Sequence, residues 1–164
     1  TYFNDMEHIL VQLLREFSGM QWREARRQRR SESVLSVIRG ANLRYCEMHE
    51  VNAHIYAALE SVAPNMPEFA ARRHELNTRL ARQVAKRLAA TGLVDLSEGQ
   101  RERLEALTLM LIAMTEASAR ERFTYGSARL AQVFGSTISF SDAISDIWER
   151  ALLAEMQNAS ASSS

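Results

Sequence analysis

Apolar residues recur at three- and four-residue spacing along most of the chain, and this periodicity is the strongest constraint on the fold. Only two prolines and six glycines occur in 164 residues. No run of alternating β-branched residues is long enough to indicate a strand. A chain of this length can bury a sizeable core, so the pattern predicts an all-α bundle of about six helices.

Local signals predict where several helices begin and where the chain stops being ordered. The expected start signals are Asn4-Asp5, Ser31 or Ser33, Pro67 at a first helical position, Ser97 with Gln100 as a capping box, and Ser139 or Ser141. The residues of segment 158–164 are small and polar, and we expect them to form a disordered tail.

The last two long helices, expected over residues 104–122 and 142–156, predict a dimer. The first of them carries apolar residues on more than one face, so it must be covered on all sides. Two copies could cover each other as a four-helix bundle across a two-fold axis. The alternative is a central helix of a monomeric bundle. The expected interface residues are Leu107, Met110, Leu111, Ile144, Ala151 and Leu152.

Charge and cysteine content exclude several classes of function. Twenty basic residues balance twenty acidic ones, whereas a surface that neutralises phosphates is normally basic. One cysteine, Cys46, excludes an internal disulfide and suits a reducing compartment. The most apolar run, residues 104–114, is too short to span a bilayer, and the start of the chain has no secretory signal pattern. We therefore expect a soluble cytoplasmic protein without membrane contact.

Motifs for catalysis or metal binding are missing from the sequence. His49 and His54 are five residues apart, about 140° out of register on a helix, whereas a zinc-protease helix needs them four apart. No Glu-x-x-His pair, phosphate-binding glycine loop or nucleophile elbow occurs. The sequence predicts no catalytic residue, no metal site and no cofactor.

Four polar or amphipathic side chains stand among apolar neighbours and are candidates for a binding site. Asn42 lies on the expected inner face of the second helix, Thr115 and Glu116 follow an apolar run, and Trp148 lies on the last helix. A buried carboxylate needs a partner, so Glu116 either pairs with Arg120 or faces a wet cavity. Trp148 can equally be a core residue or the wall of a mostly apolar ligand pocket.

The first seventeen residues carry the most specific pattern. Tyr2 and Phe3 close one element, Asn4 and Asp5 cap the next, and an apolar helical stripe follows as far as Phe17. This junction resembles the point at which bacterial repressors of the TetR family leave their DNA-binding domain. The resemblance implies that residues 1–4 are the remnant of a helix-turn-helix domain, that residues 5–157 form a TetR-type ligand-binding and dimerisation domain, and that Tyr2 contacts the DNA backbone.

The closing part of the chain resembles the mycobacterial type of repressor that governs ethionamide activation. Met114-Thr115-Glu116 and, some thirty residues later, Ile147-Trp148 are similar to its Met-Asn-Glu and Ile-Trp segments. That resemblance implies a long apolar tunnel for a small lipophilic effector. The ligand-binding residues that it suggests are Leu35, Ile38, Asn42, Cys46, Phe69, Ile112, Thr115, Glu116 and Trp148.

Together these features predict a transcriptional repressor whose helical domain binds a small lipophilic effector and forms a homodimer. The missing N-terminal domain would bind operator DNA. The alternative hypothesis is a helical interaction or structural module without a small-molecule ligand.

Overall fold

The computed structural model describes residues 33–65, 67–91 and 96–161, and these residues are all-α as predicted. The expected helix 5–17, the segment 1–4 and Tyr2 lie outside the described residues. In chain order the elements are α2 (Val34–Val51), α3 (Ala53–Val62), the 3₁₀ turn η1 (Ala63–Asn65), α4 (Pro67–Ala89), α5 (Glu98–Ala119), the π-helical turn η2 (Arg120–Thr124), α6 (Ala128–Phe134) and α7 (Thr137–Ala161).

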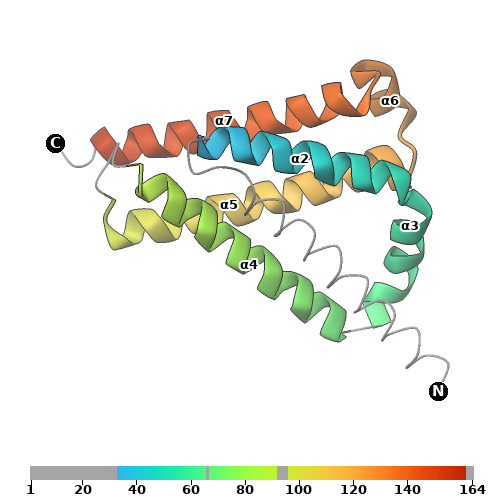
Figure 1. The fold of residues 1–164 in the computed structure, drawn as a ribbon. Helices are drawn as coiled ribbons and strands as arrows, with labels where there is room; N and C mark the ends of the chain where they lie inside the picture. Colours follow the sequence, from blue (N-terminus) through green and yellow to red (C-terminus); the bar gives the residue numbers. More distant parts are fainter. Residues whose placement is uncertain (1–32, 66, 92–95, 162–164) are drawn as a thin grey trace.

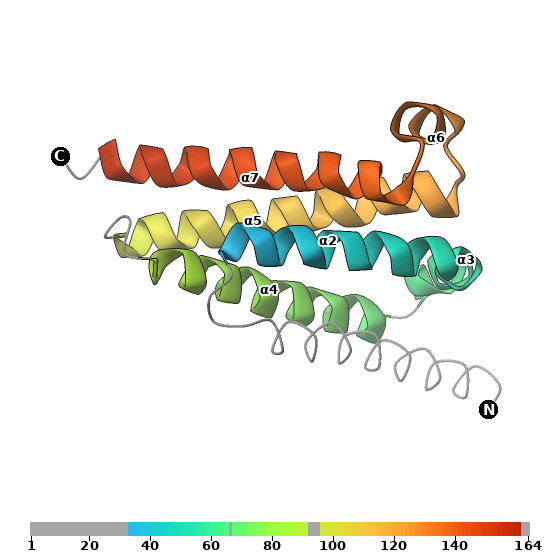
Figure 2. The ribbon, with the colours of Figure 1, turned by 45° about the horizontal axis from the view of Figure 1, so that its top comes forward.

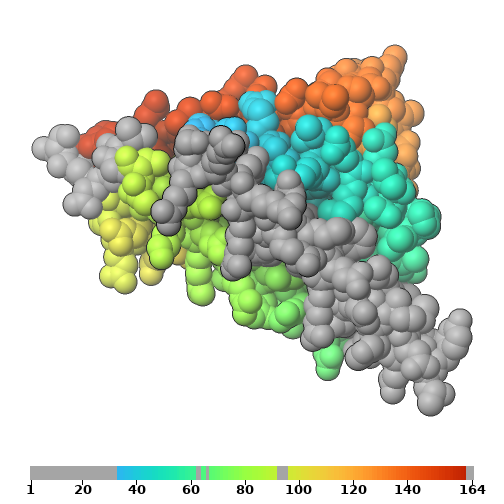
Figure 3. Space-filling view, viewed as in Figure 1, coloured from blue at the N-terminus to red at the C-terminus, as the bar shows by residue number. Residues whose placement is uncertain are grey.

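The long helices pack in two pairs, and α5 joins one pair to the other. Helix α2 lies along α7, α4 lies along α5, and α5 also packs against α7 (Figures 1 and 2). Helix α4 diverges from α2 toward the end of the molecule where α3 lies (Figure 1). In the space-filling view, the uncovered atoms of α2 (blue to teal) lie directly against those of α7 (orange to red) (Figure 3). The short helix α6 forms a corner before α7 (Figure 2).

Serine side chains begin most of these helices. Ser33 Oγ accepts a hydrogen bond from Ser36 N at 3.1 Å, and Ser97 forms the predicted capping box with Gln100. Pro67 is the first residue of α4, as predicted. The predicted cap of the last helix was wrong: α7 begins at Thr137, ahead of the two expected serines, and Ser136 Oγ accepts from Ser139 N at 3.1 Å.

The predicted disordered tail, 158–164, is corrected for residues 158–161, while residues 162–164 lie outside the described residues. Helix α7 continues to Ala161, because its last turns find a packing surface at the start of α5. Ala159 is buried, and its carbonyl accepts a hydrogen bond from Gln100 Nε2 at 3.2 Å. A composition that favours disorder is here overridden by a tertiary contact.

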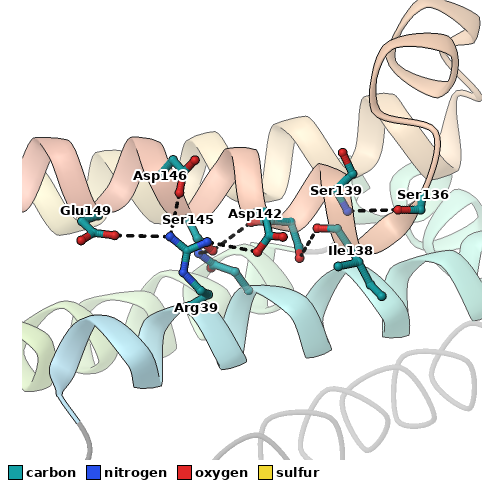
Figure 4. Close-up of polar contacts among 10 residues, drawn as sticks. Arg39, Ser136, Ile138, Ser139, Asp142, Ser145, Asp146 and Glu149 are labelled. Carbon is teal, nitrogen blue, oxygen red and sulfur yellow. Dashed lines mark hydrogen bonds and ion pairs between the residues drawn. The ribbon is translucent and has the colours of Figure 1, made fainter.

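The core lies between α2, α4, α5 and α7. Its largest fully buried side chains are Leu104, Leu152, Thr108 and Cys46. At the surface, Arg39 joins α2 to α7: its guanidinium lies 3.0 Å from Asp142, 2.7 Å from Asp146 and 3.3 Å from Glu149 (Figure 4). These three carboxylates occupy successive turns of one face of α7. Within the described residues, no helix is both long and apolar enough to cross a membrane.

Candidate functional site

Thr115 and Trp148, two of the predicted ligand residues, bond to each other in the core. Trp148 Nε1 donates a hydrogen bond to Thr115 Oγ1 at 2.8 Å, and Thr115 Oγ1 donates to Leu111 O at 2.9 Å. Both side chains are buried. The single hydroxyl proton of Thr115 is therefore already used by the protein, so the pair joins α5 to α7 as a structural contact.

Other predicted ligand residues also pack into this interior. Asn42 Nδ2 donates to Ser145 Oγ at 3.2 Å, and Ser145 Oγ donates to Ser141 O at 2.8 Å, which links α2 to α7. Buried polar groups are normally satisfied in this way. The structure brings together the following apolar members of the predicted set in one core cluster, with Leu35 only partly buried: Leu35, Ile38, Cys46, Ile112 and Trp148.

Glu116 forms a contact that neither sequence alternative named. Its carboxylate accepts a hydrogen bond from Asn77 Nδ2 on α4 at 3.0 Å. Arg120, the expected salt-bridge partner, instead places Nη1 2.9 Å from Glu60 Oε1 on α3. The reason is geometric: Arg120 begins the π-helical turn, and this turn packs against α3.

An open cleft of about 260 Å³ lies where α3, η1, α4 and η2 meet. Its lining residues are Glu60, Pro64, Phe69, Ala70, Arg73 and Arg120. Phe69 alone among the predicted ligand residues lines it, and Trp148 does not. The resemblance thus suggested a site farther along the bundle than this cleft.

Charge at the cleft is unevenly paired. Arg120 is half-buried, and its hydrogen bond to Glu60 raises the pKa of the guanidinium above its usual value. Arg73 is exposed on α4 and forms no ion pair with any residue that the structure describes. Two guanidinium groups therefore face one carboxylate at this cleft.

An aromatic cluster around His49 contacts the same π-helical turn, and sequence reasoning missed it. The imidazole stacks on Tyr56 with ring centroids 3.7 Å apart, and its Nε2 lies 3.2 Å from Thr124 Oγ1. Burial, followed by the positive charge of Arg120, lowers the pKa of His49 to about 4. Burial raises the pKa of Tyr56 to about 12. At neutral pH His49 is therefore uncharged, and its Nδ1 meets no hydrogen-bond partner among the described residues.

The sequence did carry a signal for His49. It stands four residues after Tyr45, and therefore on the same inner face of α2, but it was considered only as a zinc ligand. The π-helical turn, by contrast, had no sequence marker. Turns of this kind occur often at functional sites, and this one holds both Arg120 and Thr124.

The predicted dimer residues divide between core and surface. Leu111, Ile144 and Leu152 are only 5%, 3% and 1% exposed within a single chain, so they cannot offer a surface to a partner. This part of the prediction is corrected, because α2, α4 and α7 of the same chain pack against α5, and α2 and α5 pack against α7. Met110 remains 68% exposed, while Leu107 and Ala151 are half-buried.

Met110 and Ala151 of the predicted interface lie with other small and apolar residues on one exposed or half-buried face of α5 and α7. The Arg103–Glu155 ion pair, 2.7 Å long, shows that these two helices lie side by side at this surface. We call this set the outer face: Ala106, Met110, Ala113 and Ala117 on α5, with Ala143, Ile147, Ala151 and Ala154 on α7. Within the set, Ile147 is 49% exposed.

No protein-family model, curated protein or solved structure matches this chain. In the described part of the chain, no group of three or more histidine, cysteine, aspartate or glutamate side chains could hold a metal ion.

Proposed function

We propose that this bundle is the effector-binding and dimerisation domain of a TetR-type transcriptional repressor in the cytoplasm. The observation that carries the proposal is the cleft at the meeting point of α3, α4 and η2, where Phe69 and Pro64 supply an apolar wall beside charged groups. Ligand sites commonly combine an apolar lining with a few placed polar groups in this way. The all-α fold is the architecture that the resemblance implies.

The proposed mechanism is a shift between two spacings of paired DNA-binding domains. An effector in the cleft would contact three elements at once and favour their relative arrangement in one of the two states. It must bind the two states unequally, since equal binding shifts no equilibrium. Half-sites on an operator lie about one helical turn apart, so a changed spacing lowers affinity for DNA. The DNA-binding domains would lie N-terminal to the described bundle.

The outer face supports the dimeric part of the proposal. Met110 and Ile147 are large apolar side chains exposed on neighbouring helices. The surrounding alanines would allow a second copy to approach closely. Two copies that pair α5 and α7 in this manner would form a four-helix bundle.

Thermal-shift measurements with a library of lipophilic compounds would test the effector site. We expect some compounds to raise the melting temperature of the wild-type chain, because a ligand that binds only the folded state stabilises it. Ala70→Trp should fill the cleft and abolish these shifts. Ala71→Trp is the matched control, since Ala71 is also exposed on α4 but does not line the cleft. Shifts that survive Ala70→Trp, or no shift with any compound, would contradict the proposal.

A helical interaction module without a small ligand is the second candidate. The buried Trp148–Thr115 hydrogen bond favours it, because the tryptophan expected to line a tunnel is packed in the core. A chain that pairs through the outer face yet responds to no compound would support this candidate instead.

A further inference from the structure

We propose that the cleft selects a small organic acid, with its carboxylate held by Arg73 and Arg120 and its apolar body against Phe69 and Pro64. This inference rests on the proposed effector function and names the chemical class of the effector. It replaces a purely lipophilic molecule with an amphipathic one.

The charged residues that line the cleft indicate an anionic ligand. Glu60 is already bonded to Arg120 at 2.9 Å, and Arg73 has no ion-pair partner in the described part of the chain. The lining therefore has an excess of one positive charge. A guanidinium group matches the planar geometry of a carboxylate and can bind it through two parallel hydrogen bonds.

The electrostatic effect of the Arg120–Glu60 ion pair on its surroundings also favours an anionic ligand. At His49, next to the π-helical turn, Arg120 lowers the pKa more than Glu60 raises it. At the position of His49, the carboxylate of Glu60 thus does not cancel the positive charge of Arg120. In the cleft itself, an incoming anion would meet two arginines and one carboxylate.

The apolar wall and the volume of the cleft limit the size of the apolar part of the ligand. Phe69 is only 6% exposed, so its ring is a fixed part of the wall, and Pro64 is rigid as well. A cleft of about 260 Å³ holds the volume of roughly nine water molecules. This space suits a single aromatic ring or a short alkyl chain with one acidic group.

Isothermal titration calorimetry on the full chain can test this selection. The probes are benzoate, phenylacetate and octanoate, each compared with its neutral amide. We expect at least one acid to bind more tightly than its amide, and Arg73→Gln to weaken that acid about ten-fold, because a charge-assisted hydrogen bond is lost. Arg87→Gln is the matched control, since Arg87 is exposed on α4 and outside the cleft. Arg87→Gln should leave the affinity for the acid unchanged.

A second variant separates charge recognition from damage to the fold. Glu60→Gln removes the competing carboxylate, so it should strengthen binding of the acid several-fold, which a disrupted cleft could not do. If the amides bind as well as the acids, or if Arg73→Gln has no effect, the inference fails while the effector proposal stands. If neither acids nor amides bind, and no lipophilic compound shifts the melting temperature, both fail.

Discussion

At the scale of single residues, side chains that looked like ligand contacts are engaged in the protein's own hydrogen bonds. Thr115 accepts from Trp148 and donates to a backbone carbonyl, so its hydroxyl is satisfied without a ligand. Asn42 similarly bonds to Ser145. The sequence marks these residues as special because they are polar at apolar positions. It could not determine whether their partner was a ligand or another helix.

The Thr115–Trp148 bond should contribute measurably to stability. Thr115→Val leaves the buried indole N–H unpaired, and we expect a loss of about 1–3 kcal/mol in the free energy of unfolding, measured with urea. Thr108→Val is the matched control: Thr108 is also buried on α5 and bonds to the carbonyl four residues earlier, but no tryptophan in the described part of the chain bonds to it. Equal losses in the two variants would show that the indole bond contributes nothing.

His49 should make stability depend on pH. Its pKa is about 4 in the folded protein, below the ordinary 6.5, so the unfolded chain takes up a proton first as the pH falls. The stabilisation is complete above pH 6.5 and decreases from there down to about pH 4, with a slope approaching ~1.4 kcal/mol per pH unit. Urea unfolding between pH 7 and about 5 measures this slope. His49→Gln should flatten it, and the exposed His74→Gln should not; an unchanged slope in His49→Gln would refute the assignment.

At the scale of elements, the sequence predicts the features whose signals lie within a few residues of each other. The starts at Ser33, Pro67 and Ser97 were predicted because a cap depends on bonds within one turn. The end of α7 was not predicted, because it depends on a contact with the start of α5, which is distant in the sequence. The π-helical turn was missed for the same reason: no residue type marks it, and its contacts are with α2 and α3.

The ion pairs of Arg39, which join α2 to α7, give a prediction at this scale. Arg39→Gln leaves three neighbouring carboxylates without their shared cation, and we expect a loss of about 0.5–1 kcal/mol at low salt, because the groups are partly exposed. The loss should shrink in high salt, which screens exposed charges. Arg44→Gln on the same helix is the control, since no described ion pair involves Arg44. A loss that is independent of salt would indicate a packing effect instead.

At the scale of the whole molecule, the fold class followed from periodicity, but the position of the cleft did not. Helical spacing shows which face of a helix is apolar, and it placed Asn42 on the inner face of α2, where it is buried. It does not show which helices diverge. The cleft exists because α4 and η2 meet α3 at one end of the molecule, and Glu60 and Arg73 gave no sign in the sequence that they share it.

The same distinction applies to the proposed dimer. An apolar helix needs a cover, but only the tertiary structure shows how much of that cover comes from the same chain. Here the inward face of α5 is covered within the chain, and what remains exposed is the outer face with Met110 and Ile147. In the proposed dimer, association would therefore depend on these two side chains rather than on Leu111, Ile144 or Leu152.

We expect the wild-type chain to sediment as a dimer at micromolar concentration, and Met110→Glu or Ile147→Arg to convert it to a monomer, because a charge buried without a partner opposes association. Leu153→Arg is the matched control. Leu153 is also exposed on α7, at 43%, but lies about 120° around the helix from Ile147 and outside the outer face. Sedimentation velocity distinguishes the cases. If Leu153→Arg also produces monomers, or if the wild-type chain is itself monomeric, the outer face is not the surface that joins two copies. The proposed shift between two spacings of paired DNA-binding domains then loses its basis.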